Sequence, residues 1–403
     1  MKKLLPLCLA VLFAAACAPA AKYVTLNGKA IEKVRKNIRP GETPAYDALI
    51  RKADSFLKAK PLSVTMQTVT PPSGDKHDYM SMGPYWWPDP SKPDGLPYIR
   101  RDGQHNPEIK KMESRTFLGK TVDRVNTLGQ AWFFSRDEKY AAKAAELLRV
   151  FFIDEETKMN PNLTYGQSIP GICTGRGVGL IDTHGLGGMM DALLLLDSSK
   201  SWTAADKKAM QAWIEAFYTW MLESEIGKDE GRAKNNHGSA YDFQICAYAI
   251  YCGHPEVARE QIEKVTRKRM DEQFPADASQ PWELARTNSW GYSTMNLNIW
   301  MELAATAEGL GIDLWSWKND KGVGLKDVVE WYFPFLRGEK PWIKKDINPK
   351  RSAGNIHRIM REYCRRYCPD RLGEFEQQIF TFTGDTKYKT DVPVYNLLYP
   401  LDR

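Results

Sequence analysis

Residues 204–226 read AADKKAMQAWIEAFYTWMLESEI, and residues 236–251 read NHGSAYDFQICAYAIY. In both stretches apolar side chains recur every three or four residues, which is the spacing of a helix with one buried face. Similar periodicity predicts further helices at 30–37, 44–59, 108–135, 138–152, 183–196, 255–270, 293–310, 325–336, 355–367 and 373–382. Most of them follow one another in pairs, few strands are expected, and no repeat of fixed length indicates a regular solenoid. The pattern predicts an all-α fold: a single (α/α)n toroid, an incomplete barrel of about six or seven helical hairpins, with long loops that form a cleft.

The N-terminus has the pattern of an export signal. Two lysines precede an apolar run that ends at Ala16 and is too short to cross a bilayer as a mature helix. The run is followed by Cys17 and resembles a bacterial lipobox, in which the cysteine becomes the lipidated first residue. We therefore expect a lipoprotein-type signal peptide at 1–16, a lipid on Cys17 and one domain over 17–403, with cleavage near Ala21 as the alternative. These features predict an exported protein, namely a periplasmic or outer-membrane lipoprotein of a Gram-negative bacterium.

Composition and missing motifs exclude several classes of protein. The net charge of +6 comes from 56 basic and 50 acidic residues, and falls to +4 when the two signal lysines are removed. This weak excess does not indicate a nucleic-acid partner, but it is compatible with an acidic substrate attracted by a local groove. The sequence contains no zinc-protease pair, nucleophile elbow or P-loop, and its scattered cysteines make a poor disulfide framework, so no metal or cofactor is expected. Thirteen Trp and 18 Tyr are many for a core, and aromatic-rich clefts often stack on sugar rings.

The first candidate site is KNNHG at 234–238, directly before an apolar helix. An Asn at a helix start commonly caps the helix, and one Asn suffices for this purpose. A second Asn followed by His places an amide and an imidazole together at the positive end of the helix, where an anion binds favourably. Asn236 and His237 are therefore catalytic candidates, with Asn235 beside them as a substrate contact. Capping by itself is the alternative explanation.

The second candidate site is ELARTNSWGYS at 283–293. Arg286 can bind a carboxylate through two parallel hydrogen bonds. A cation beside a phenol favours the phenolate, so we expect Arg286 to lower the pKa of Tyr292. The alternative is a surface ion pair between Arg286 and Glu283, with Tyr292 half-buried in the core.

Two loops supply candidate substrate contacts. The segment 79–90, YMSMGPYWWPDP, holds three consecutive aromatic residues that cannot all face one core. The Gly-rich segments YGQSIPG at 165–171 and GRG at 175–177 allow polar side chains to approach a ligand. Loops that only pack against themselves or lie on the surface are the alternatives. The expected contacts are stacking by Tyr85, Trp86 and Trp87, subsites lined by Tyr165, Gln167 and Arg176, and positive potential from Lys344 or Lys345.

Together these segments resemble the alginate-lyase superfamily of α/α-toroid polysaccharide lyases, and within it polysaccharide lyase family 38, which acts on alginate and glucuronan. The similarity runs from about residue 78 to residue 345 and includes motifs at 77–79, 85–88, 102–103, 106–108, 165–171, 235–238 and 286–292. The resemblance implies a catalytic set of an adjacent Asn–His pair with an Arg and a Tyr, which falls on Asn236, His237, Arg286 and Tyr292. The six-residue step from Arg286 to Tyr292 differs slightly from that of some relatives.

The resemblance implies β-elimination on a 1,4-linked uronate polymer, with mannuronate-containing alginate as the first choice. A base removes the C5 proton, the C4 oxygen leaves, and a C4=C5 double bond forms. Donors must first neutralise the neighbouring carboxylate, a task that suits Asn236, His237 and Arg286. In mannuronate and glucuronate the two reacting groups share one face, so Tyr292 can serve as both base and acid. In guluronate they lie on opposite faces, so His237 becomes the base and Tyr292 the acid.

Three other functions remain open from the sequence. A glucuronan lyase would use the same mechanism. An α/α-toroid glycoside hydrolase would use two carboxylates, which the sequence does not single out. A non-catalytic glycan-binding lipoprotein would use the same aromatic cleft. In each case the partner is a glycan, an acidic one for either lyase, and membrane contact is expected only through the lipid anchor.

Overall fold

The computed structural model describes residues 22–385 and 394–401. The predicted signal peptide and Cys17 lie outside the described residues. Within the described ranges, none of the helices combines the length and the apolar character needed to cross a membrane.

The fold is all-α, which confirms the predicted class. The helices are α1 (Gly28–Asn37), α2 (Pro44–Phe56), α3 (Ser114–Ser135), α4 (Glu138–Leu148), α5 (His184–Leu195), α6 (Ala204–Glu223), α7 (Glu225–Gly231), α8 (Asn236–Cys252), α9 (Pro255–Glu260), α10 (Arg267–Gln273), α11 (Pro281–Leu284), α12 (Ser289–Gly309), α13 (Leu325–Glu330), α14 (Phe333–Leu336), α15 (Gly354–Tyr367), α16 (Leu372–Thr383) and α18 (Tyr395–Leu398). The strands are β1 (Met80–Met82), β2 (Trp86–Trp87), β3 (Ile99–Arg100) and β4 (Tyr165–Ser168). β1 pairs with β4 in parallel, and β2 pairs with β3 antiparallel.

Local chemistry explains most of the helix ends. Thr203 and Asp206 form a capping box at the start of α6, and Gly253 ends α8 in the left-handed region at φ 85°. The predicted helix 325–336 is interrupted at 331–332, because Pro334 in the first turn of α14 has no N–H to donate to the carbonyl of Glu330, the last residue of α13. α12 begins at Ser289, four residues earlier than predicted, because Asp346 accepts a 2.6 Å hydrogen bond from the Ser289 N–H.

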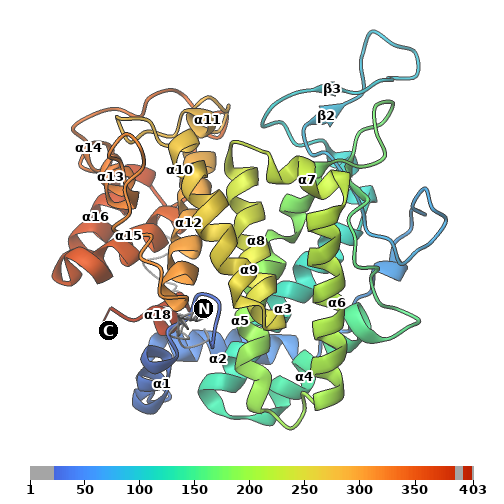
Figure 1. The fold of residues 1–403 in the computed structure, drawn as a ribbon, viewed down its shortest axis with the longest axis horizontal. Helices are drawn as coiled ribbons and strands as arrows, with labels where there is room; N and C mark the ends of the chain where they lie inside the picture. Colours follow the sequence, from blue (N-terminus) through green and yellow to red (C-terminus); the bar gives the residue numbers. More distant parts are fainter. Residues whose placement is uncertain (1–21, 386–393, 402–403) are drawn as a thin grey trace, which may run out of the picture.

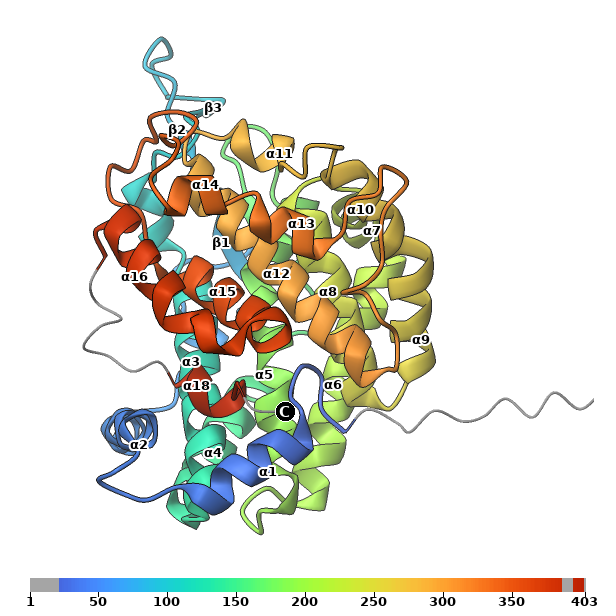
Figure 2. The same cartoon turned by 90° about the vertical axis from the view of Figure 1, so that its left-hand side faces the viewer.

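The longer helices pack in a row around a continuous apolar core (Figures 1 and 2). Contacts join α2 to α3, α3 to α5, α5 to α8, α8 to α12 and α12 to α15. Other helices cover this row: α4 packs on α3, α6 and α9 pack on α8, and α16 packs on α15. Closure of six or seven hairpins into a toroid stays a prediction.

The two ends of the helical row carry different segments. β2, β3, α7 and α11 gather at one end, the top of Figure 1. α1 and α18 lie at the opposite end, and Figure 2 shows the same separation. The motifs predicted from the sequence belong to the first end.

Candidate active site

Tyr292 lies in the first turn of α12, where its hydroxyl is 2.5 Å from the hydroxyl of Tyr85. Tyr85 comes from the loop between β1 and β2, and its ring meets His105 edge-on at 5.1 Å between centroids. Two phenols distant in the sequence therefore share one hydrogen bond. The structure places Tyr85 beside the Tyr292 hydroxyl, and the expected stacking of Tyr85 on a sugar ring stays a prediction.

Arg286 lies directly over the ring of Tyr292, with its guanidinium carbon 3.8 Å from the ring centroid. The guanidinium is held by Asp102, which accepts from Nη2 at 2.7 Å and from Nε at 3.1 Å. Asp102 also accepts from the backbone N–H and the hydroxyl of Thr287 at 3.1 and 2.9 Å. The partner of Arg286 is thus Asp102 and not Glu283. Nη1 is the nitrogen of Arg286 that has no hydrogen-bond partner among the described residues.

The expected lowering of the Tyr292 pKa is wrong for this structure. Burial raises the pKa of Tyr292 well above its ordinary value, and the hydrogen bond with Tyr85 raises it further. The charge of Arg286 opposes this rise but does not overcome it. The sequence showed the cation next to the phenol, but it did not show how little solvent reaches the hydroxyl.

Asp102 remains ionised, because its hydrogen bonds outweigh the effect of burial, unlike those of Tyr292. Partial burial by itself raises the pKa of this carboxyl, but the hydrogen bonds from Arg286 and Thr287 outweigh burial and hold the pKa well below its ordinary value. A permanent negative charge therefore anchors the guanidinium over Tyr292.

His237 stands at the start of α8 with its Nδ1 2.6 Å from Oε1 of Glu230. Glu230 belongs to α7 and is 3% exposed. Because a carboxylate only accepts, the ring nitrogen that faces it must donate. In the neutral imidazole the proton then sits on Nδ1 and the lone pair on Nε2, which has no partner among the described residues.

The two asparagines before His237 have different surroundings from those expected. Asn235 is the N-cap of α8, and its side chain accepts from the His237 N–H at 3.3 Å. Asn236 is fully buried, and its Nδ2 donates to Glu283 at 2.8 Å. This differs from the free amide that we expected to neutralise a substrate carboxylate. Oδ1 of Asn236 is buried and unpartnered among the described residues.

Glu283 connects the two halves of the site. It accepts from the backbone N–H of Asn236 at 2.6 Å as well as from its side chain. Burial raises the pKa of Glu283, while these hydrogen bonds and the charge of Arg286 counter part of the rise. Because Glu283 stands three residues before Arg286 and binds the residue next to His237, the two motif segments meet at this carboxyl.

The Gly-rich loop brings Arg176 to the same region. A Cβ on Gly177 would lie 2.8 Å from the backbone nitrogen of Glu230, so the absence of a side chain lets this loop contact α7 closely. Arg176 lies over the ring of Trp86 at 5.8 Å, and burial lowers its pKa although Glu230 and other acids oppose this effect. Gln167 is 4% exposed and accepts from Arg176 at 3.1 Å. Gln167 is therefore a buried residue that positions Arg176, and its place in a subsite stays a prediction.

The remaining predicted contacts surround these groups. Trp87 is half-buried, donates from Nε1 to the carbonyl of Gln104 at 2.9 Å, and has Arg101 5.5 Å from its ring. Tyr165 pairs with Met80 in the β1–β4 ladder. Lys344 and Lys345 precede Asp346, which binds the start of α12. Among the residues that the structure describes, no group of three or more His, Cys, Asp or Glu could hold a metal ion.

A sequence profile described as "Alginate lyase" matches residues 63–342, well over half of the chain. The chain belongs to the alginate lyase family. It is a polysaccharide lyase of this family, and its assignment to polysaccharide lyase family 38 stays a prediction.

Solved structures of alginate lyases are similar to this family member. The crystal structure of an alginate lyase from Bacteroides ovatus matches with a TM-score of 0.86 at 40% identity, over 95% of this chain and 100% of that one. A histidine-to-alanine variant of alginate lyase A1-III, complexed with a tetrasaccharide, matches with a TM-score of 0.61 at 15% identity, over 89% of this chain and 92% of that one. Alginate lyase A1-III from Sphingomonas species A1 gives 0.52 at 14% identity, over 84% and 94%. At such identities the A1-III structures show a shared fold. A comparison with curated protein sequences gave no match.

The roles of three acidic residues of this lyase were not predicted from the sequence. Glu230 and Glu283 are buried beneath His237 and Asn236, and Asp102 binds Arg286 across 184 positions. Asp102 belongs to a motif that carries the family resemblance, but neither periodicity nor spacing indicates its partner. Short-range sequence patterns cannot show such contacts, because they depend on the packing of the loops.

Proposed function

We propose that this lyase cleaves alginate, a 1,4-linked uronate polymer, by β-elimination. The observation that carries the proposal is the Tyr292 hydroxyl beside the Arg286 guanidinium, with the segment of His237 joined to theirs through Glu283. The similarity at 40% identity to the Bacteroides ovatus alginate lyase supports this substrate.

Arg286 is the residue best suited to neutralise the substrate carboxylate. Its contacts with Asp102 use Nε and Nη2 and fix the plane of the guanidinium, so Nη1 remains for an anion. A guanidinium bound to the substrate carboxylate stabilises the negative charge that develops when the C5 proton leaves. Asn236 has its amide nitrogen on Glu283, so in this state it holds the start of α8 in place beneath the site. Its neutralising role would require the amide to exchange this contact for one with the substrate.

His237 is suited to act as the base for guluronate. Glu230 accepts the Nδ1 proton and so leaves Nε2 able to take the C5 proton. Tyr292, whose raised pKa keeps it protonated at neutral pH, then gives its proton to the C4 oxygen on the other face. Glu230 acts through His237 and is therefore a positioning residue.

For mannuronate, Tyr292 serves as both base and acid on a single face. With its raised pKa, this role requires a small population of phenolate, which the guanidinium of Arg286 over the ring stabilises. Glucuronate differs from mannuronate at C2 and has the same reacting geometry. Glucuronan is therefore the alternative substrate, to be distinguished by contacts with the 2-hydroxyl.

A substrate panel tests the proposal. The protein is incubated with alginate, poly-mannuronate, poly-guluronate and glucuronan, and the ultraviolet absorbance of the unsaturated product is followed. We expect the chromophore with alginate and its loss on every substrate in Tyr292→Phe, by a factor of about 10² to 10⁴, because the acid is missing. Reducing ends without a chromophore would indicate a hydrolase, and binding without either product would indicate a glycan-binding protein. Strong residual turnover by Tyr292→Phe would contradict the assigned acid.

We also retain the export prediction as a proposal. Residues 1–16 would be removed and Cys17 lipidated, which would hold the lyase at a membrane of the periplasm. Labelling with a radioactive fatty acid in wild-type cells and in Cys17→Ser cells tests this, since cleavage near Ala21 would leave both unlabelled.

A further inference from the structure

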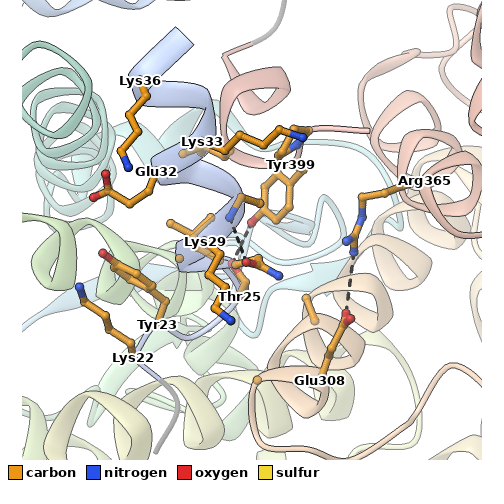
Figure 3. A pocket seen from close by; sticks show the side chains of 18 of the residues that line it. Lys22, Tyr23, Thr25, Lys29, Glu32, Lys33, Lys36, Glu308, Arg365 and Tyr399 are labelled. Atoms are coloured by element: carbon orange, nitrogen blue, oxygen red, sulfur yellow. Dashed lines mark hydrogen bonds and ion pairs between the residues drawn. The ribbon is translucent and has the colours of Figure 1, made fainter. Parts of the chain in front are cut away.

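A large concavity lies at the end of the helical row opposite the candidate active site. It has a volume of about 1150 Å³ and lies between α1, the ends of α12 and α15, and the residues that follow α18. Ala30, Ala305 and Gly309 are among its lining residues, and their small side chains leave space between the helices. Figure 3 shows Lys29, Lys33 and Lys36 extending from α1 around this groove, with Arg365 and Glu308 across it.

The groove carries an uncompensated positive charge. Five basic and two acidic side chains line it: Lys22, Lys29, Lys33, Lys36, Arg365, Glu32 and Glu308. Glu32 already pairs with Arg35 at 2.7 Å and with Arg136 at 3.5 Å, and Glu308 pairs with Arg365 and Arg366. The four lysines are exposed and form no ion pair among the described residues.

The lysines of α1 are arranged in a line. Lys29, Lys33 and Lys36 are four and three residues apart, which places them on one side of the helix. With a rise of 1.5 Å per residue, they span about 10 Å along the axis. A line of cations beside a concave surface suits an extended chain with regularly spaced anionic groups. A bilayer surface would instead require a flat or convex face.

We propose that this groove, lined by Lys22, Lys29, Lys33 and Lys36, is a second binding site for the acidic polysaccharide and binds the carboxylates of a chain segment away from the catalytic cleft. This inference rests on the proposed function, because it takes its ligand from the proposed substrate. A polymer bound at both the groove and the candidate active site dissociates more slowly than one bound at the candidate active site alone, since binding at the second site is intramolecular. A short oligosaccharide cannot occupy both sites and gains nothing from the groove.

The test compares Lys29→Gln/Lys33→Gln/Lys36→Gln with a control that removes three exposed lysines elsewhere, Lys200→Gln/Lys208→Gln/Lys268→Gln. Both variants should keep the melting temperature of the wild type. We expect the groove variant to raise KM for long alginate about tenfold at low salt, since three weak ion pairs are lost, and to leave kcat/KM for a short oligomannuronate unchanged. The control should change neither. An unchanged polymer KM, or an equal rise in the control, would overturn the proposal.

A binding measurement separates failure of the groove from failure of the proposed function. Oligomannuronate is titrated by calorimetry into Tyr292→Phe protein with and without the three groove substitutions. A fall in the binding stoichiometry from two oligosaccharides per chain to one supports the groove as a binding site. This result is independent of whether the wild type turns over alginate. A stoichiometry that the substitutions do not change overturns it. Loss of binding to phosphatidylglycerol vesicles without any loss of oligosaccharide binding would also overturn it, in favour of a membrane contact.

Discussion

Replacing Glu230 by Gln tests how the protein orients His237. The carboxylate is 3% exposed and lies 2.6 Å from Nδ1, so the imidazole has a single orientation and its lone pair is on Nε2. The Gln side chain has nearly the same shape but can donate its own N–H to Nδ1. The ring can then adopt the other tautomer, with the proton on Nε2, where it can no longer accept the C5 proton.

The size of the effect follows from the hydrogen bond that is lost. A hydrogen bond to a charged group contributes about 1.5 to 3 kcal/mol, which corresponds to a factor of about 10 to 150. We expect this loss in kcat on poly-guluronate, where His237 is the base, with little change in KM. On poly-mannuronate, where Tyr292 takes the proton, the loss should stay below about tenfold, because His237 then assists only in neutralising the carboxylate.

The assay is the initial rate of product absorbance on both polymers. Glu225→Gln, an exposed residue of the same helix α7, is the matched control and should behave as wild type. Glu230→Asp keeps the charge and should recover part of the guluronate activity. The reasoning is refuted if Glu230→Gln, with an unchanged melting temperature, cleaves poly-guluronate as fast as Glu225→Gln does.

Three further outcomes are expected. Because the Tyr292 pKa is raised well above neutral, kcat/KM on poly-mannuronate should rise with pH by up to tenfold per unit between pH 7 and 9. Poly-guluronate should show no such rise. Equal pH profiles on both polymers would contradict the assignment of the Tyr292 phenolate as the base. Asp102→Asn removes the charge that anchors Arg286, and should lower kcat/KM on alginate about 10- to 100-fold. The circular-dichroism spectrum should remain that of the folded protein. Wild-type rates in this variant would show that Asp102 is dispensable. Hydrogen bonds from Arg149 lower the pKa of Asp206 to about 2, so the stability they contribute is present above about pH 4 and is lost as the pH falls towards 2. Urea unfolding at pH 6 and pH 3 should show a smaller difference for Asp206→Asn than for the wild type, and an equal difference would exclude this contribution.

Much of the fold could be predicted because helices leave a local signal. The periodicity of 204–226 and 236–251 identified α6 and α8, and the all-α class follows from many such segments. The exact starts were less predictable, since α12 begins where Asp346, far away in the sequence, binds its first N–H groups. α18 was missed because four residues are too few to show a period.

The candidate site could be predicted in its residues but not in its contacts. The motifs at 235–238 and 286–292 indicated an Asn–His pair and an Arg–Tyr pair, and the structure brings their segments together at Glu283. The burial of Asn236 and Gln167, and the raised pKa of Tyr292, depend on how many atoms surround each side chain. No pattern of residue types contains that information. The proposed signal peptide and lipid anchor stay predictions from the sequence.

By itself, the sequence determined the helical class, the family resemblance and the chemical groups available for elimination, because each of these is encoded by neighbouring residues. The tertiary structure decided which groups act on one another. It placed Asp102 against Arg286, Glu230 against His237 and Tyr85 against Tyr292, each through contacts between separate segments. The physical reason is that the protonation and orientation of these groups are set by burial and by hydrogen-bond partners, and both exist only when the chain is packed.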